Sequence, residues 1–272
     1  MKYPWGDGPL SYSLLKLLDP DLGSPAEFLH ACKAERKPTD AMRLGTCTHW
    51  HLLGGPPERK PLVYPASKTT GEGAVKNWKA YQAEHAGEEI FGAAEWNKGA
   101  EIAHAVRSAP HSAPVATWLD EEGHEYEVAL SWEMGGIPFA TRGVDVLLPR
   151  SRRLADVKKC SSVRRYLLDR QCHSLRYPEQ LVVYEAAVRA CRFDPAGSAV
   201  LAVCEEAPYC SVVLPLGAAA RATAADRVGR WLTLLRSCLD ADLWPGPEGW
   251  ELEPPAWDVA VTGEGELPVG VA

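Results

Sequence analysis

The stretch from Thr141 to Cys160, TRGVDVLLPRSRRLADVKKC, constrains the fold more than any other part of the chain. Its pattern predicts two short strands joined by a turn. Side chains alternate between the two faces of a strand, so Asp156 and Lys158 should point to one side and Val157 into the core. A hairpin of this kind can bring Asp145, at the end of a Gly-Val-Asp motif, beside them.

Two carboxylates and a lysine on neighbouring strands are the groups that metal-assisted phosphodiester cleavage needs. Asp145 and Asp156 can hold one or two divalent cations, which polarise the phosphate and lower the pKa of a bound water. Lys158 can orient that water or neutralise the charge that develops in the transition state. The same Asp-x-Lys pattern also fits a solvated surface ion pair, so the flanking sequence must decide between the two interpretations.

Composition sets broad limits on the class of protein. The chain has 272 residues, 46% of them apolar, enough for one large domain or two small ones. It contains no apolar run long enough to span a membrane, and its start lacks the apolar segment of a signal peptide, so we predict a cytoplasmic protein without a membrane anchor. The eight cysteines form no Cys-x-x-Cys pair, which predicts reduced, mostly buried thiols.

The net charge of −7 argues mildly against nucleic-acid binding, but the charges are unevenly distributed. Basic residues crowd around the central motif, and a local field matters more than the total charge for attracting a polyanion. Each of these residues also fits an ordinary surface position. We predict DNA contacts from Arg142, Lys159, Arg164 and Arg165.

Two helices are predicted well before the central motif. Ser24-Pro25-Ala26-Glu27 offers a serine N-cap, a proline at the first helical position and a glutamate at the third. A second helix should run from Thr39-Asp40 to Leu53. Within it, Gly45 and His49 are four residues apart and share one face. A glycine there costs helix stability but permits the close approach of a backbone or a ligand.

His49 is therefore a candidate metal ligand or phosphate contact. The alternative is a core histidine bonded to a backbone carbonyl, and the local sequence alone does not exclude it. The segment from Glu125 to Trp132 alternates as a strand, so Glu125 or Glu127 could line the same site or lie on an exposed strand edge.

A further helix is predicted from Tyr177 to Cys191. Tyr177, Gln180 and Tyr184 are spaced three and four residues apart and share one face. This stripe of two aromatic rings and an amide could face the site, or it could belong to ordinary amphipathic packing. Two apolar strands and a long amphipathic helix follow, with inward positions predicted at Ala222, Ala225, Val228, Leu232, Leu235 and Leu239.

Taken in order, these motifs resemble a known family. They are Leu-Ser-Tyr-Ser, Ser-Pro-Ala, Leu-Gly-Thr-x-Thr-His, Arg-Gly-Val-Asp, Asp-Val-Lys, Tyr-x-x-Gln-x-x-x-Tyr, and finally Trp-Pro-Gly with Pro-Pro-x-Trp. The series, from about Leu10 to Trp257, resembles the exonuclease VIII (RecE-type) branch of the PD-(D/E)XK nucleases. Each motif alone is weak, but seven in this order with these spacings are specific.

The resemblance implies an α/β fold with a mixed central sheet flanked by helices and an N-terminal helical segment. On this basis residues 1–258 should form one nuclease domain, with a helical part at 10–108, a sheet core at 115–258 and a disordered tail at 259–272. It implies Mg²⁺ dependence, with Mn²⁺ as a substitute, and 5′-to-3′ digestion of duplex DNA from a free end. It also implies a homo-oligomer and partnership with a single-strand annealing protein.

The resemblance further implies roles for individual residues. His49, Asp145, Asp156 and the Val157 carbonyl would hold metal, and Lys158 would be the catalytic lysine. Gln180 would stand beside the site, flanked by Tyr177 and Tyr184 as DNA contacts. From the strand alternation, and not from the resemblance, Glu125 and Glu127 are predicted to support the ligands. The chain departs from the family where threonines usually follow the lysine, because it has Lys159-Cys160.

Two other functions fit the same residues. One is an endonuclease or a CRISPR-type DNA-processing nuclease, which would cut covalently closed circles that an exonuclease spares. The other is a scaffold that binds DNA ends without turnover, which would need no metal.

Overall fold

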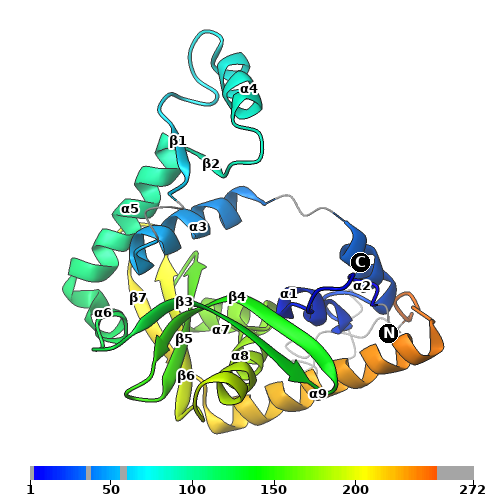
Figure 1. Cartoon of the computed structure of the whole chain (residues 1–272). Coiled ribbons are helices and arrows are strands. Elements are labelled where there is room, and N and C mark those ends of the chain that lie inside the picture. Colours follow the sequence, from blue (N-terminus) through cyan, green and yellow to red (C-terminus); the bar gives the residue numbers. More distant parts are fainter. Residues whose placement is uncertain (1–2, 35–37, 56–59, 250–272) are drawn as a thin grey trace, which may run out of the picture.

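The computed structural model describes residues 3–34, 38–55 and 60–249. Its centre is a five-stranded mixed sheet (Figure 1) in the order β3-β4-β5-β6-β7. All neighbouring strands are antiparallel except β5 and β6, which run parallel. The mixed sheet flanked by helices matches the predicted fold class. The strands are β3 Glu125–Met134, β4 Ile137–Leu148, β5 Arg153–Cys160, β6 Gly197–Cys204 and β7 Ser211–Pro215.

Helices cover both faces of this sheet. Side chains from α1, α2, α7, α8 and α9 pack on one face, and side chains from α3, α5 and α6 pack on the other. None of the helices in the described ranges combines the length and the apolar character of a membrane span. The helices on the first face are α1 Tyr12–Leu15, α2 Pro25–Lys33, α7 Arg165–Ser174, α8 Tyr177–Cys191 and α9 Ala218–Ala241, with the 3-10 turn η1 Lys16–Leu18. The others are α3 Asp40–Leu53, α4 Ala74–Glu84, α5 Ala93–Ser108 and α6 Ala113–Leu119, with the 3-10 turn η3 Pro110–Ser112.

Local capping explains where α2 and α3 begin. The Ser24 side chain accepts a hydrogen bond from the Glu27 N–H, with proline at the first helical position. The Thr39 side chain accepts one from the Met42 N–H, and Gly54 ends α3 with a φ of +68°, a left-handed conformation that glycine adopts without strain. The predicted starts of both helices are confirmed.

Alternation along the central strands separates the two cores. On β5, Leu154 packs toward α8 and α9, whereas Ala155 and Val157 pack toward α3, α5 and α6. Asp156 and Lys158 therefore face the α8 side, and Val157 faces the α3 side. This is the arrangement that the sequence predicted for these three residues.

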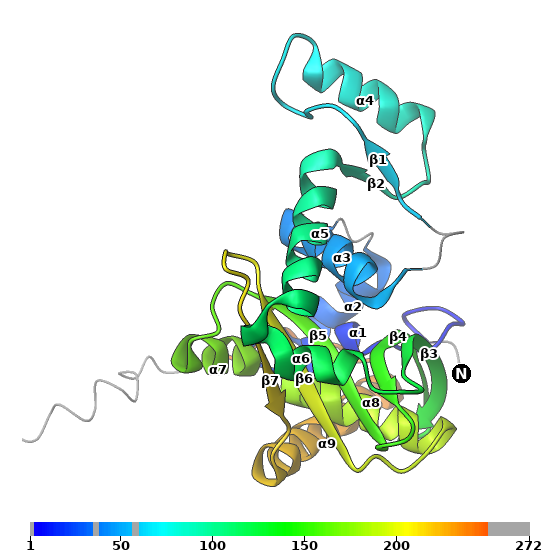
Figure 2. The same cartoon turned by 90° about the vertical axis from the view of Figure 1, so that its left-hand side faces the viewer.

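One segment stands out from the rest of the fold (Figures 1 and 2). Strand β1, Leu62–Tyr64, pairs in parallel with β2, Ile90–Gly92, and α4 lies between them in the chain. We call residues 60–92 the arm. Residues 56–59, just before the arm, lie outside the described ranges. At the base of the arm, Arg43 Nε donates to Glu95 Oε1 over 2.8 Å.

The segment LSYSLLKLL forms only the short α1 and η1, and its first residue, Leu10, bridges to Phe139 of the sheet. Along α9 the buried face differs from the predicted one at its start: Ala222 and Ala225, predicted to point inward, are exposed, whereas Ala224 and Trp231 are buried. The eight cysteines, all within the described ranges, form no disulfide, as expected. The tail predicted at 259–272 lies outside the described residues.

Candidate active site

The site begins where two strands part. Strands β4 and β5 pair from Leu148 and Arg153 up to Val146 and Ala155. Beyond that pair, Asp145 Oδ2 accepts the Val157 N–H over 2.7 Å, so a carboxylate takes the place of a backbone partner. Asp145 therefore lies in the gap between the two strands, buried but for a small exposed fraction.

Strand β3 brings a second carboxylate to this gap. The register between β3 and β4 shifts after Val128, and Glu127 has a φ of +51°. The flanking pairs place Glu127 opposite Asp145. A side-chain carbon on Gly143 would lie 2.6 Å from Glu127 Oε2 and 3.0 Å from its Cα. Gly143, the glycine of the Gly-Val-Asp motif, lies in the bulge of β4 opposite Ala129 and is therefore what lets Glu127 approach β4.

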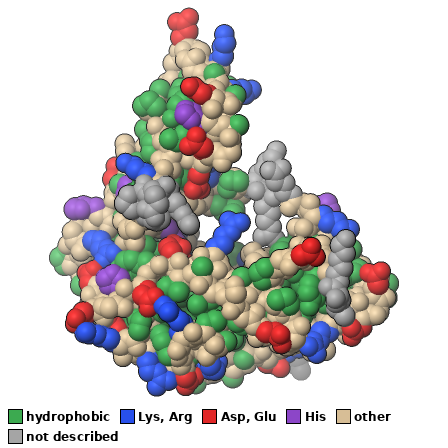
Figure 3. All heavy atoms as spheres, viewed as in Figure 1, with side chains coloured by type: hydrophobic (Ala, Val, Ile, Leu, Met, Phe, Trp, Pro, Cys, Tyr) green, Lys and Arg blue, Asp and Glu red, His purple; other side chains and the backbone are tan. Residues whose placement is uncertain are grey.

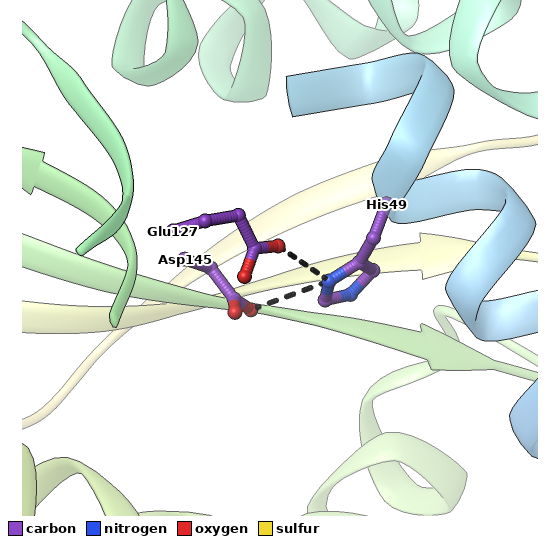
Figure 4. A group of neighbouring side chains, drawn as sticks. All are labelled: His49, Glu127 and Asp145. Atoms are coloured by element: carbon purple, nitrogen blue, oxygen red, sulfur yellow. Dashed lines mark ion pairs between the residues drawn. The ribbon is translucent and has the colours of Figure 1, made fainter. Parts of the chain in front are cut away.

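Helix α3 supplies an imidazole to the same two acids (Figure 4). His49 Nδ1 lies 3.7 Å from Glu127 Oε1 and 3.8 Å from Asp145 Oδ2. Its Nε2 lies 2.9 Å from the Val157 carbonyl oxygen. His49 was predicted to be either a metal ligand or a histidine bonded to a backbone carbonyl. Its ring makes the carbonyl contact and also faces the two carboxylates, so the two interpretations are compatible.

The position of α3 is set by close packing on α5. A side-chain carbon on Gly99 of α5 would lie 2.7 Å from Cys47 Cβ and 2.9 Å from the Thr48 backbone nitrogen. The two helix backbones can approach this closely only because Gly99 has no side chain. This contact holds the segment that precedes His49 by one or two residues.

The ligand atoms of His49, Glu127 and Asp145 all lie within 4.8 Å of one another. We call these three residues the acidic cluster. Burial alone would lower the pKa of His49, but Asp145 and Glu127 raise it to about 9. The imidazole is therefore a cation at neutral pH in the protein alone. Like charges directly opposite on paired strands are destabilising, so the cluster favours a cation between its carboxylates. One nitrogen and several oxygen donors fit a divalent metal ion.

A second set of groups faces the α8 side of the same strands. Lys158 Nζ lies 2.6 Å from Asp156 Oδ2, and Gln180 Nε2 lies 3.3 Å from Asp156 Oδ1. The same Gln180 nitrogen donates to the Tyr184 hydroxyl over 2.9 Å. The Tyr177 ring centre is 5.4 Å from Lys158 Nζ. The predicted stripe on α8 therefore packs around the Asp156–Lys158 pair.

Charge states follow from this packing. Burial raises the pKa of Asp156 to about 6, with Lys158 opposing and Asp145 adding to the rise. Burial would lower the pKa of Lys158, but Asp156 and Asp145 raise it above its ordinary value. Lys158 is therefore protonated at neutral pH and can stabilise negative charge, but it cannot accept a proton.

With this geometry in place, comparison with known proteins identifies the family. Residues 11–251 match the family described as a PDDEXK-like domain of unknown function (DUF3799). The chain belongs to this family. No protein among the curated sequences matches significantly. The fold is also similar to the crystal structure of a protein from Eubacterium rectale described as a "putative exonuclease". That similarity has a TM-score of 0.58 and 14% sequence identity over 94% of this chain and 93% of the other.

The PDDEXK-like assignment confirms the nuclease superfamily that the sequence predicted, while the RecE-type branch stays a prediction. The structure brings Asp145, Asp156, Lys158 and Gln180 together. Within the described residues, however, the cluster with metal-ligand spacing contains Glu127 in place of Asp156. Sequence alternation suggested Glu127 only as a supporting residue, because neither its left-handed backbone nor the register shift beside it can be inferred from alternation.

Several predicted contacts are placed differently. Glu125 forms an ion pair with Arg192 at the far end of α8 and does not join the cluster. Tyr177 and Tyr184 are each only 8% exposed, so they support the site from within the fold and are not placed to touch DNA. Lys159 points away from Lys158 and pairs with Glu205, which corrects its assignment as a DNA contact.

The three predicted arginines remain available to a ligand. Arg142, Arg164 and Arg165 are exposed, and Arg165 meets Asp169 only at 3.6 Å across an exposed turn of α7. Their contact with DNA stays a prediction.

Proposed function

We propose that this PDDEXK-like protein is a metal-dependent deoxyribonuclease, and specifically an exonuclease acting on linear duplex DNA. One observation carries the proposal. Asp145 lies in the gap between β4 and β5, with His49 and Glu127 against it from one side and the Asp156–Lys158 pair on the other. Few structural roles would require three acids to gather around one gap in a sheet.

His49, Glu127 and Asp145 would hold the divalent ion, with Asp156 and the Val157 carbonyl as further oxygen donors. Mg²⁺ suits oxygen donors of this kind, and Mn²⁺ accepts the imidazole more readily. When bound, such an ion polarises the scissile phosphate and lowers the pKa of an attacking water.

The chain's own groups have distinct tasks in this scheme. Lys158 carries a fixed positive charge that can offset the charge developing on the phosphate. The Gln180 amide, anchored on Asp156 and Tyr184, keeps the Asp156 carboxylate oriented toward the gap. Rigid strands and the start of α8 hold these groups, which favours a preorganised site.

DNA would be bound chiefly through its phosphates. Arg142, Arg164 and Arg165 are exposed cations in or near the central motif, and phosphate contacts of this type weaken with salt and carry little base specificity. The RecE-type branch, the 5′-to-3′ polarity, the homo-oligomer and a single-strand annealing partner are proposals that rest on the sequence resemblance. Light scattering of the purified protein measures the oligomeric state directly.

The decisive experiment compares end-labelled linear duplex with a covalently closed circle, each with and without Mg²⁺. We expect mononucleotides or short fragments from the linear duplex only, and only with the metal. Lys158→Ala should abolish cleavage, whereas Lys159→Ala, one residue along on the opposite face, should retain it. Cutting of the circle would favour the endonuclease, and wild-type protein without any metal-dependent cleavage would reject the proposal.

A further inference from the structure

None of the described residues accounts for Gly45. It lies in the middle of α3, where a glycine costs helix stability relative to alanine. Its φ is not in the left-handed region, so the backbone does not require it. A side-chain carbon built there meets nothing within 4 Å among the described residues. Gly99, by contrast, is explained at once by the backbone of α3 lying against it.

The face of α3 that carries Gly45 leads to the acidic cluster. Met42, Gly45 and His49 are three and four residues apart and so share one face of the helix. We call this face the α3 track. At its inner end the His49 ring reaches Glu127 and Asp145, and at its outer end the Met42 side chain is 57% exposed. An exposed methionine beside a bare helix backbone forms an apolar strip that leads to charged groups.

Gly45, in the middle of the track, is partly exposed. The surface is hollowed between the upper part of the molecule, with α3 and the arm, and the lower body (Figure 3). Along the helix axis Gly45 is about 6 Å and Met42 about 10 Å from His49, at roughly 1.5 Å of rise per residue. With about 3.4 Å per nucleotide along a B-form strand, the track spans roughly three nucleotides.

We propose that a strand of nucleic acid crosses α3 at Gly45 on its way to the acidic cluster. Its sugar–phosphate backbone contacts the Gly45 Cα, and the Met42 thioether packs on the apolar face of a sugar or base. The inference rests on the proposed nuclease function and adds a substrate-positioning surface to it. The nucleic-acid strand occupies the space that a side chain at residue 45 would fill.

The test uses Gly45→Ala and Gly45→Leu, with Thr46→Leu as the matched control. Thr46 is exposed on the next position of the same helix, and its hydroxyl only bonds the Met42 carbonyl. Kinetics are measured on linear duplex and on thymidine 5′-p-nitrophenyl phosphate, a diester too small to reach Met42. Thermal unfolding is measured for every variant.

We expect both Gly45 variants to raise Tm by about 2–4 °C, because a helical glycine is replaced in open space. Gly45→Leu should lower kcat/KM on duplex at least about tenfold more than on the small diester, mainly through KM. Thr46→Leu should retain the activity of the wild-type protein on both substrates. Gain of stability with loss of DNA cleavage is the signature of a side chain that blocks a ligand and leaves the fold intact.

Three results would overturn the inference while leaving the nuclease proposal standing. They are undiminished duplex cleavage by Gly45→Leu, an equal loss on both substrates, and a lowered Tm for Gly45→Ala. The first would mean that no strand passes residue 45, and the other two that the glycine serves the fold. A wild-type protein that cleaves neither substrate would instead refute the proposed function.

Discussion

The replacement of Gly143 by alanine tests how the site is assembled. Gly143 lies in the bulge of β4, beside the β3 segment that carries Glu127. The added carbon would lie 2.6 Å from Glu127 Oε2, 3.0 Å from its Cα and 3.1 Å from its carbonyl carbon. The carboxylate could rotate away, but the two backbone atoms can move only if the β3 backbone at Glu127 shifts.

The size of the effect follows from these distances. Ordinary contacts of such a carbon are several tenths of an ångström longer, so Glu127 must move by roughly 0.5–1 Å. Overpacking of this kind costs about 1–3 kcal/mol, and the lower backbone entropy of alanine offsets about 0.5–1 kcal/mol of it. A displacement of about 1 Å in a catalytic group can lower the rate by about a hundredfold. Activity should therefore fall much further than stability.

Two measurements follow from this reasoning. Thermal unfolding of Gly143→Ala should show a net loss of at most about 2 kcal/mol, and cleavage of linear duplex with Mg²⁺ should fall by about 10- to 100-fold. Gly197→Ala is the matched control, because Gly197 begins β6 of the same sheet and its added carbon meets nothing within 4 Å. Wild-type cleavage by Gly143→Ala would show that the position of Glu127 does not matter to the reaction.

Three further predictions concern stability. Asp19→Ala should lower the free energy of unfolding, measured by chemical denaturation, by about 3 kcal/mol, because it leaves the buried Arg176, which Asp19 binds at 2.9 and 3.0 Å, without this partner. Asp21→Ala, whose carboxylate is 77% exposed, should lower it by less than about 1 kcal/mol. Equal losses in the two variants would refute this reasoning. Burial would raise the pKa of Glu95, but hydrogen bonds from Arg43 and Lys68 lower it to about 2. The contribution of Glu95 to the free energy of unfolding is therefore present above pH 4.5 and is lost as the pH falls toward 2. Glu95→Gln should thus lower stability by about 2 kcal/mol at pH 7, after allowance for partial exposure, and the difference should shrink below pH 4.5 in pH-dependent melts. Finally, Mg²⁺ or Mn²⁺ at a hundred times its dissociation constant should raise stability by about 2.7 kcal/mol over protein in EDTA, and an unchanged Tm in titration would count against a metal site.

Much of the local structure could be predicted because it depends on short-range chemistry. The caps at Ser24 and Thr39 satisfy free backbone N–H groups next to them in the chain, so the starts of α2 and α3 follow from a few adjacent residues. Helix α8 runs from Tyr177 to Cys191 as predicted. Alternation on β5 placed Asp156 and Lys158 on one face without any knowledge of their neighbours.

The assembly of the site depended on contacts between distant segments. Glu125 and Glu127 look equivalent in an alternating strand, yet Glu127, whose backbone is left-handed beside the register shift, reaches His49, while Glu125 pairs with Arg192. No local pattern encodes this, because the register shift is defined by the pairing of β3 with β4.

The sequence by itself therefore determined the mixed sheet with its flanking helices, the face on which the Asp156–Lys158 pair lies, and the identity of the histidine that reaches the site. Only the tertiary structure decided that β4 and β5 part at Asp145, that Glu127 completes the acidic cluster, and that the α3 track is open at Gly45. The physical reason is that backbone periodicity acts over a few residues, whereas strand separation, bulges and empty surface arise from the packing of segments far apart in the chain.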